Sequence, residues 1–213
     1  MNNKDQNNRS VIYRTIGASN HVEAEREEND YYATHPIAIH SLCDLEEFSN
    51  EILEPCCGEG HISKVLESKG YVVESMDLID RGYGKGGVNF LEYNEIVDKD
   101  IITNPPYSLA QDFLEHAMEI VTDGHKVAMF LKLTFLESSR RKEMFKKYPP
   151  KKIWVSSSRI PCGKNGDFYQ RNSDGSIKCD RDGNPKEVSS AVCYAWFIFE
   201  KGYQGPMIID LFN

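Results

Sequence analysis

Short apolar runs alternate along this chain with segments that have the character of helices. The runs typical of strands lie at 51–55, 71–78, 100–103, 125–136, 152–160 and 191–200. The segments expected to be helices are 37–45, 62–70, 108–121 and 138–148. Residues 125–136 are nearly all apolar, as in a strand that is buried on both faces. This alternation predicts an α/β fold with a mostly parallel sheet and helices on both faces.

The chain divides into an arm, a domain and an insertion. Residues 1–30 are rich in Asn, Glu and Asp with few large apolar side chains, so we expect a flexible polar arm. Residues 31–213 are expected to form a single domain, because 213 residues suit one well-packed core better than two. Residues 162–190 are polar and hold the turn signals NSDGS and RDGNP. We interpret this insertion as a mobile hairpin or as an element that recognises the target.

Charge and composition narrow the functional classes. The net charge is −8, which excludes a protein that coats nucleic acid but allows a local basic patch. No apolar run is as long as a membrane span, and the opening MNNKDQNNRS lacks the hydrophobic core of a signal peptide. The six cysteines form no C-x-x-C pair, so we expect reduced thiols and no metal site. We therefore expect a cytoplasmic protein that does not enter membranes.

A glycine-containing turn follows the strand at 51–55. Gly58 and Gly60 permit positive φ angles and let a ligand approach the backbone closely. Asp77 closes the next strand, where a carboxylate can accept hydrogen bonds from ribose hydroxyls. Glu54 precedes the turn and would repel a pyrophosphate, so it favours a nucleoside with a cationic tail such as S-adenosylmethionine. For the glycines alone, a tight connection between strand and helix is the alternative interpretation.

The stretch Asn104-Pro105-Pro106-Tyr107 follows the strand at 100–103. An exocyclic amine on a nucleobase is a poor nucleophile because its lone pair is delocalised. Two fixed acceptors, the Asn104 side-chain oxygen and the Pro105 carbonyl, can hold both N–H groups so that the lone pair points outward. Consecutive prolines stiffen the loop, and Tyr107 offers a flat face for an extruded base. Both this stretch and the glycine turn end predicted strands, so we expect them at the same edge of the sheet.

This order of motifs resembles the S-adenosylmethionine-dependent amino-methyltransferases, above all the N6-adenine DNA methyltransferases that carry NPPY. DYYATHP at 30–36 looks like the family's cofactor-binding motif ahead of the glycine turn, which is similar to the small gamma-type form of phages and prophages. The resemblance covers residues 30–205. It implies a Rossmann-like class I methyltransferase fold, S-adenosyl-L-methionine as methyl donor, S-adenosyl-L-homocysteine as product, and a bacterial or phage-infected cell.

The resemblance also implies roles for individual residues. Those around the cofactor would be Tyr32, Thr34, Glu54, Pro55, Gly58, Gly60, Asp77, Leu78, Asn89, Phe90 and Asn104. Within this set, Tyr32 and Thr34 would touch the methionine carboxylate and Asp77 the ribose. Asn89 stands where the family usually has Asp beside the cofactor adenine, and an amide can still accept from an amino group. Those that hold the target amine, and so catalyse transfer, would be Asn104, Pro105, Pro106 and Tyr107.

Two segments are candidates for contact with the substrate. A basic segment at 138–152 would contact DNA phosphates, and a solvated helix face is an equally good interpretation. Its candidate residues are Arg140, Arg141 and Lys142. In the insertion, Phe168 is a candidate for stacking on a flipped base. The family often has an aromatic residue near Ile160, where this chain is aliphatic, so Phe168 would substitute or stacking would rest on Tyr107.

Three functions stay open from the sequence. The first is methylation of adenine N6 in duplex DNA, by a monomer or a homodimer. The second is the same chemistry on an RNA base or on a protein glutamine, although neither an RNA-binding module nor an N-terminal helical domain is visible. The third is a binding module with the methyltransferase fold and no turnover, which Asn89 and Ile160 favour and the intact NPPY stretch disfavours.

Overall fold

In the computed structural model, residues 32–164 and 166–213 are described, and they belong to one compact unit, Tyr31–Asn213. The arm expected at 1–30 lies outside the described residues. Seven strands form the main sheet in the order β3-β2-β4-β5-β8-β6-β9. Their bounds are β2 Glu51–Glu54, β3 Val72–Ser75, β4 Asp100–Thr103, β5 Lys126–Lys132, β6 Lys152–Ser156, β8 Tyr194–Glu200 and β9 Ile208–Phe212. A separate antiparallel pair joins β1 (Tyr32–Thr34) to β7 (Cys162–Lys164).

The main sheet is mostly parallel, as the sequence predicts. Strand β2 pairs in parallel with β3 and β4, β4 with β5, and β6 with β9, whereas β8 runs antiparallel to β5 and β6. The glycine turn follows β2 and the NPPY stretch follows β4. Since β2 and β4 are parallel neighbours, the two motifs leave the sheet side by side at its carboxyl edge, which confirms the expected arrangement.

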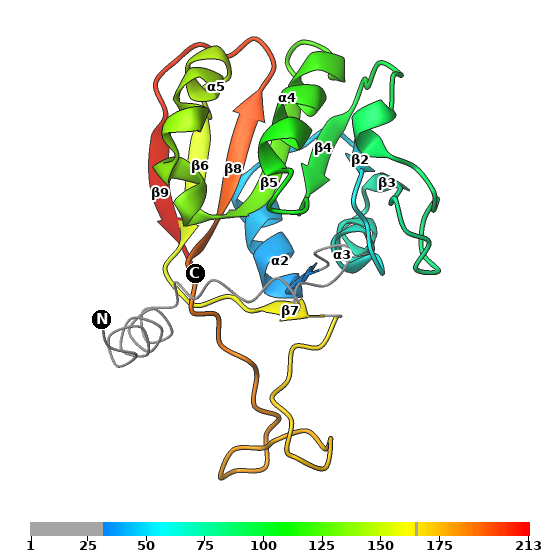
Figure 1. Ribbon diagram of the computed structural model, residues 1–213, viewed down its shortest axis with the longest axis vertical. Coiled ribbons are helices and arrows are strands. Elements are labelled where there is room, and N and C mark those ends of the chain that lie inside the picture. The colour runs from blue at the N-terminus through cyan, green and yellow to red at the C-terminus, as the bar shows by residue number, and fades with distance from the viewer. Residues whose placement is uncertain (1–31, 165) are drawn as a thin grey trace, which may run out of the picture. The chain divides into compact units, whose positions relative to one another are not determined.

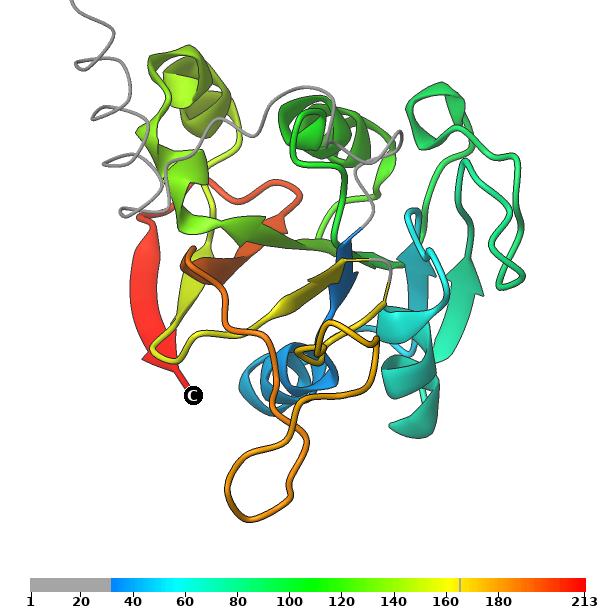
Figure 2. The ribbon, with the colours of Figure 1, turned by 60° about the horizontal axis from the view of Figure 1, so that its bottom comes forward.

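Helices cover both faces of the sheet (Figures 1 and 2). Their bounds are α2 Pro36–Leu45, α3 His61–Ser68, α4 Ala110–Ile120 and α5 Lys142–Lys147. Helices α2 and α3 lie on one face and α4 and α5 on the other. Alternate strand residues supply two cores, so that Ile102 and Phe130 pack with α2 and α3 while Ile101 and Met129 pack with α4. Among the described residues no helix is long and apolar enough to cross a membrane.

Several predicted elements end elsewhere than expected. The apolar run 125–136 is a strand only as far as Lys132 and continues as a 3₁₀ helix, η3 (Leu133–Glu137). Phe135 is buried in that helix, so hydrophobicity does not mark the end of the strand. The expected helix 138–148 consists of a 3₁₀ turn, η4 (Ser139–Arg141), followed by the short α5.

Three strands, β1, β7 and β9, were not predicted. Strand β7 lies at the start of the stretch that was expected to be a polar insertion. Strand β1 has three residues, which is too short for a periodic pattern. Strand β9 lies at the edge of the main sheet, and four of its five residues are exposed although they include Ile208, Ile209 and Leu211. The apolar residues of β9 are therefore mostly exposed, so this strand lacks the link between hydrophobicity and burial that identifies the other strands.

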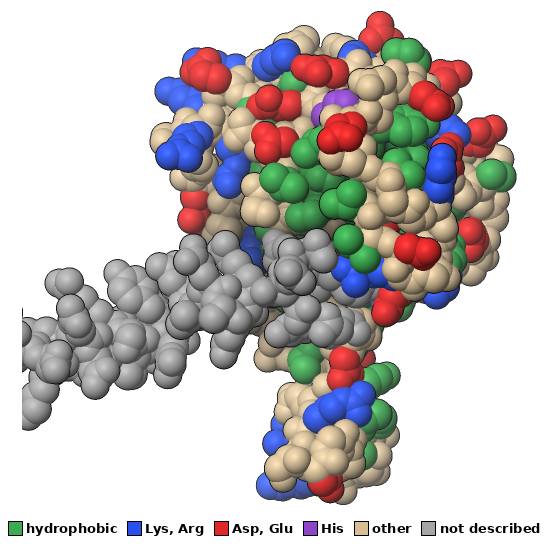
Figure 3. Space-filling model, turned by 45° about the vertical axis from the view of Figure 1, so that its right-hand side comes forward, with side chains coloured by type: hydrophobic (Ala, Val, Ile, Leu, Met, Phe, Trp, Pro, Cys, Tyr) green, Lys and Arg blue, Asp and Glu red, His purple; other side chains and the backbone are tan. Residues whose placement is uncertain are grey.

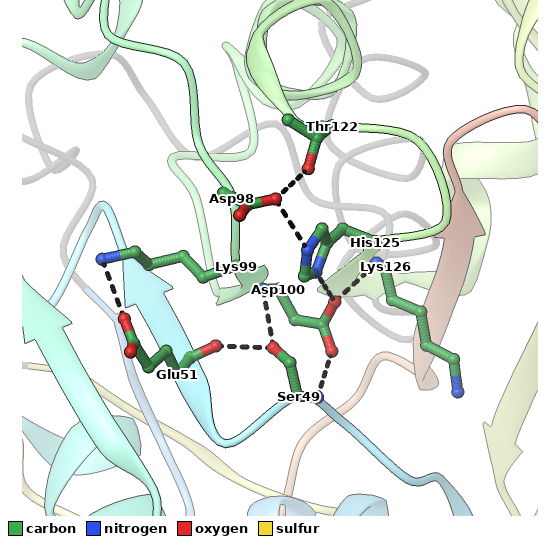
Figure 4. Close-up of polar contacts among 8 residues, drawn as sticks. All are labelled: Ser49, Glu51, Asp98, Lys99, Asp100, Thr122, His125 and Lys126. Carbon is green, nitrogen blue, oxygen red and sulfur yellow. Dashed lines mark hydrogen bonds and ion pairs between the residues drawn. The ribbon is translucent and has the colours of Figure 1, made fainter.

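A polar network fixes the amino edge of the sheet, opposite the two motifs (Figure 4). Asp100 is 4 % exposed, and its carboxylate accepts hydrogen bonds from the backbone N–H groups of Ser49 at 2.6 Å and Lys126 at 2.8 Å. Its Oδ1 also lies 2.9 Å from Nδ1 of His125. Because Asp100 begins β4 and Asn104 follows its end, this network anchors the strand that carries the NPPY stretch.

Candidate active site

The glycine turn is packed beneath an aromatic ring. Gly58 and Gly60 have φ angles of 53° and 81°, in the left-handed region that favours glycine. A Cβ on Gly60 would lie 2.6 Å from ring atoms of Tyr83, so the ring rests directly on this backbone. The Tyr83 hydroxyl donates a hydrogen bond of 2.9 Å to Glu67 of α3, which holds the ring in place. The sequence does not reveal this contact, because a tyrosine within the glycine-rich stretch 81–87 carries no signal that it packs on another turn.

Glu54 is buried at the end of β2, with 1 % of its surface exposed. One carboxyl oxygen accepts a hydrogen bond from the Ser63 N–H at 2.9 Å and another from the Ser63 hydroxyl. Burial raises the pKa of Glu54 to about 8, while the bonds from Ser63 act in the opposite direction. Ser63 stands where a dinucleotide-binding turn would have its third glycine. Its side chain therefore explains the departure from that pattern, because it anchors the acid.

Asp77 lies beside the turn, as its position after β3 predicts. Its Oδ2 accepts a hydrogen bond from the Gly58 N–H at 2.8 Å, and its Oδ1 accepts one from the Ile79 N–H at 2.9 Å. Each oxygen keeps a further lone pair that can accept from a ligand. Leu78, the next residue, is 55 % exposed and leaves an apolar surface next to the carboxylate.

The NPPY stretch holds two hydrogen-bond acceptors that have no partner among the described residues. The side-chain nitrogen of Asn104 donates to the Tyr32 carbonyl at 2.8 Å, which turns Oδ1 away from that strand. Within the described part of the chain, this buried Oδ1 accepts no hydrogen bond, and neither does the Pro105 carbonyl. The Pro106 carbonyl, in contrast, accepts from the Leu109 N–H at 2.9 Å. A buried acceptor without a partner is costly, which is typical of a site that a ligand completes.

Two further oxygens near these acceptors also lack a hydrogen-bond partner in the described part of the chain. Thr34 on β1 and Thr103 at the end of β4 are each 2 % exposed, and their hydroxyl oxygens form no hydrogen bond with any described residue. Strand β1 reaches the NPPY stretch through the bond between Tyr32 and Asn104. The carboxyl edge therefore collects several buried polar oxygens on neighbouring elements, as expected for a site that binds a polar ligand.

The ring of Tyr107 contacts the described side chains of Tyr32, Tyr194 and Lys132. Its ring centroid lies 6.1 Å from that of Tyr32 with the planes nearly parallel, and 6.1 Å from that of Tyr194. The ammonium of Lys132, at the end of β5, lies 4.4 Å from the Tyr107 ring centroid. Sequence reasoning did not single out Lys132, because a lysine at the end of an apolar run is usually a solvated terminus.

Two expected cofactor residues serve local structure. The Asn89 side chain caps the 3₁₀ helix η2 (Phe90–Glu92), accepting from the Leu91 N–H at 3.2 Å and donating to Glu92 at 2.9 Å. Phe90 is 2 % exposed and packs against Phe113 at 5.2 Å between ring centroids. The Asn89 oxygen keeps one lone pair that can still accept from an amino group.

The insertion leans on the glycine turn and then projects away from the globular part (Figures 1 and 3). Phe168 lies edge-on to His35 at 4.9 Å and to His61, the first residue of α3, at 5.8 Å between ring centroids. A Cβ on Gly166 would lie 2.8 Å from the carboxylate of Glu59. Farther along the insertion, isolated antiparallel bridges such as that between Tyr169 and Glu187 pair its two halves. The insertion thus places Phe168 against His35 and His61, beside the glycine turn.

The basic segment is only partly available for a ligand. Arg141 donates to the Phe135 carbonyl at 2.7 Å and lies 4.3 Å from the centre of that ring, and burial lowers the pKa of its guanidinium. Arg140 and Lys142 are exposed and form no ion pair with any described residue. The described residues contain no group of three His, Cys, Asp or Glu side chains suited to a metal ion.

Comparison with solved structures identifies the fold. The chain aligns with a candidate class I S-adenosylmethionine-dependent methyltransferase from Listeria monocytogenes with a TM-score of 0.51 and 14% identity, over 82% of this chain and 62% of that chain. It aligns with the modification subunit of a candidate type I restriction enzyme from Vibrio vulnificus with a TM-score of 0.55 and 14% identity, over 99% of this chain and 52% of that chain. A candidate hemolysin from Lactococcus lactis gives a TM-score of 0.51 at 13% identity, over 81% and 92%.

These likenesses show the Rossmann-like class I methyltransferase fold that the sequence predicts. The chain spans 62% and 52% of the lengths of the first two proteins. Comparison with protein families and with curated proteins gives no match. The chemistry is therefore argued below from the site itself.

The residues at the carboxyl edge fit S-adenosylmethionine. The buried oxygens of Thr34 and Asn104 can accept from an ammonium or an amine, and Asp77 has lone pairs free for ribose hydroxyls. Asp77 beside the turn disfavours a pyrophosphate. Burial raises the pKa of Glu54 to about 8, and a cationic ligand would favour its ionised form.

Proposed function

We propose that this chain transfers a methyl group from S-adenosylmethionine to the N6 amine of adenine in duplex DNA. The observation that carries the proposal is the pair of unpartnered acceptors, Asn104 Oδ1 and the Pro105 carbonyl, on a proline-stiffened loop. An exocyclic amine has two N–H donors, so its donors match these two acceptors in number. The fold supports a methyl donor bound at the same sheet edge.

The chain's contribution is to hold the amine in a reactive geometry. When bound, S-adenosylmethionine supplies an activated methyl group. Asn104 and Pro105 accept one N–H each, which draws the nitrogen out of conjugation and directs its lone pair outward. Asn104 is held in this orientation by its own bond to the Tyr32 carbonyl. Neither acceptor is a strong base, so the proton released from the nitrogen passes to water.

The proposed cofactor contacts are those that the family resemblance implies, and the buried oxygens at the carboxyl edge support them. Thr34 and Tyr32 would hold the methionine carboxylate, and Asp77 would accept from the ribose. Glu54 would act through the turn that it anchors, and Leu78 would cover the adenine. The remaining proposed contacts are Pro55, Gly58, Gly60, Asn89 and Phe90.

For the target, we propose that the base lies against Tyr107 and that the insertion reads its surroundings. This role is supported by the start of the insertion, where Gly166 and Phe168 lie against the glycine turn and the first residue of α3. Phe168 would contact a flipped nucleotide from the cofactor side. Arg140 and Lys142 would contact phosphates, with Arg141 holding η3 and η4 together.

A transfer assay with three acceptors tests the proposal. Purified protein and labelled S-adenosylmethionine are offered unmethylated duplex DNA, transfer RNA and a cell extract. We expect label in N6-methyladenine from DNA. The variant Asn104→Ala should lose this activity, and the control Asn94→Ala, which removes an exposed amide that bonds only within its own loop, should keep it.

The other outcomes contradict the proposal in distinct ways. Label in RNA bases, or in a glutamine carboxamide, would assign the same loop to another amine. Binding of labelled cofactor with no transfer to any acceptor would support a binding module with this fold.

A further inference from the structure

The ammonium of Lys132 lies over the Tyr107 ring, and no described carboxylate pairs with it. Lys132 ends β5, and its Nζ lies 4.4 Å from the Tyr107 ring centroid. No hydrogen bond or ion pair of this ammonium with a described residue accompanies that contact. Other lysines in the described chain have carboxylate partners, such as Lys126 with Glu46 at 2.7 Å. Lys132 is therefore positioned by an aromatic face, which attracts a cation but is a weaker partner than a carboxylate.

The other two neighbours of Tyr107 are held more firmly. Tyr194 is 6 % exposed and stacks on Phe130 at 5.2 Å between ring centroids. Tyr32 lies in β1, whose backbone pairs with β7 and whose carbonyl accepts the Asn104 amide. Of the three, Lys132 has the long flexible side chain and the single weak contact. It is the neighbour that can leave most readily when a ligand approaches the ring.

We propose that Lys132 holds the place of the target base over Tyr107 and moves to a phosphate of the target nucleotide when that base enters. This inference rests on the proposed function, since it assigns the substrate class of the same site. Entry of a planar base replaces the ammonium on the ring. The displaced charge then needs an anion nearby, and the phosphate linked to the same nucleotide supplies it.

The proposal selects nucleic acid as substrate over the other amines that an NPPY loop can hold. A glutamine carboxamide brings no negative charge, so it would leave the displaced ammonium without a partner. A nucleotide brings a base for Tyr107 and a phosphate for Lys132 together. Lys132 is thus a specificity residue, distinct from the acceptors Asn104 and Pro105.

Nuclear magnetic resonance of ¹³C-dimethylated lysines observes directly whether the Lys132 ammonium lies over the Tyr107 ring. In the free protein, the ring current of Tyr107 should shift the Lys132 methyl signal upfield. Lys132→Arg assigns this signal by removing it, and Tyr107→Leu should return it to the ordinary lysine position. With an S-adenosylmethionine analogue bound, deoxyadenosine monophosphate should return the Lys132 signal to the ordinary lysine position. Deoxyadenosine should shift the signal less, and a glutamine-containing peptide should leave it unchanged.

Kinetics supply the second readout. Lys132→Met should raise the KM for DNA about tenfold and leave kcat within about twofold, because a charge-assisted contact to substrate is lost. It should also lower the salt slope of DNA binding by about one. Lys132→Arg should restore most of the affinity. The control Lys69→Met removes a lysine that pairs with Asp44 near the end of α3, and it should change neither value.

The results separate this inference from the proposed function. A Lys132 signal that is not shifted in the free protein, or that stays shifted when DNA is bound, overturns the placeholder even if methyl transfer occurs. A signal that moves with deoxyadenosine monophosphate in a protein that transfers no methyl group supports the placeholder and contradicts the proposed reaction. Unchanged KM and salt slope in Lys132→Met would also overturn it.

Discussion

Glu54 is a carboxyl group buried at the end of β2, beside the glycine turn. Its partners are the N–H and hydroxyl of Ser63, and the Ser63 hydroxyl also lies 2.6 Å from that of Ser75. With a pKa of about 8, the acid is mostly protonated at neutral pH. A cation bound beside it would favour its ionised form, so the group is suited to respond to a charged ligand.

The raised pKa of Glu54 predicts a pH dependence of stability. The unfolded chain ionises this group near 4.5 and the folded chain near 8, so between these values the folded state holds the extra proton. The free energy of unfolding contributed by Glu54 is therefore fully present below 4.5 and lost as pH rises through about 8, by an amount on the order of a few kcal/mol.

The variant Glu54→Gln isolates this contribution, because an amide cannot ionise. Urea unfolding of both proteins at about pH 5, 6.5 and 8.5 measures it. We expect the wild-type protein to lose stability relative to the variant as pH rises. A constant difference across the range would mean that Glu54 is already ionised in the folded protein.

The turn between β2 and α3 is the element that joins sheet, helix and loop. Gly60 is in the left-handed region and is covered by Tyr83, whereas Gly70, at the other end of α3, has a φ of 97° with open space around it. The two glycines therefore share a backbone constraint and differ in packing. This difference makes Gly70 a matched control for Gly60.

Gly60→Ala and Gly70→Ala should have different effects. Each adds backbone strain of about 1–2 kcal/mol, and Gly60→Ala adds the displacement of Tyr83, which costs about 1–3 kcal/mol more. We expect Gly60→Ala also to weaken cofactor binding at least tenfold, since the turn must shift. Thermal unfolding and calorimetry with S-adenosylmethionine measure the two effects. Equal losses of stability and of cofactor affinity in the two variants would show that the Tyr83 contact does not define the turn.

Elements with strong patterns were predictable from sequence, and those set by tertiary pairing were not. Strand β4 matches the prediction because DIIT is apolar and ends at a proline pair. The strand in 125–136 ends early, because Phe135 is buried in a 3₁₀ turn as it would be in a strand. Strand β1 exists only through its pairing with β7, some distance away in the chain.

The residues of the candidate site divide in the same way, into those predictable from sequence and those that depend on tertiary contacts. Sequence motifs located the acceptors Asn104 and Pro105 and the acid Asp77 at one edge, because residue type and strand order define them. They did not reveal Tyr83 or Lys132, whose importance depends on which side chain folds over the turn or the ring. A tyrosine between glycines and a lysine at a strand end carry no distinguishing local signal.

At the scale of the molecule, the net charge is −8. Acidic and basic side chains intermingle on the face drawn in Figure 3. Within the basic segment, Lys146 pairs with Glu143 at 2.7 Å and Lys147 lies 4.0 Å from Glu119. Arg140 and Lys142 form no such pair with described residues. These two cations are therefore the ones most available to an anionic polymer.

Salt dependence of DNA binding tests this distribution. Each phosphate contact adds about 0.9 to the slope of log affinity against log salt, so Arg140→Ala with Lys142→Ala should reduce the slope by nearly two. Lys146→Ala with Lys147→Ala makes the same change in net charge and should reduce it less. Fluorescence anisotropy across salt concentrations measures both slopes. Equal reductions would assign the effect to overall charge rather than to a contact surface.

The central claim is that two unpartnered oxygens grip the amine that receives the methyl group. Single-turnover transfer to unmethylated DNA, compared among wild type, Asn104→Asp and Asn104→Ala, tests it most directly when cofactor affinity is measured alongside. We predict that Asn104→Ala loses at least about a thousandfold in rate and that Asn104→Asp, which keeps an acceptor oxygen, retains measurable transfer. Wild-type rates in Asn104→Ala with N6-methyladenine as product would contradict the account.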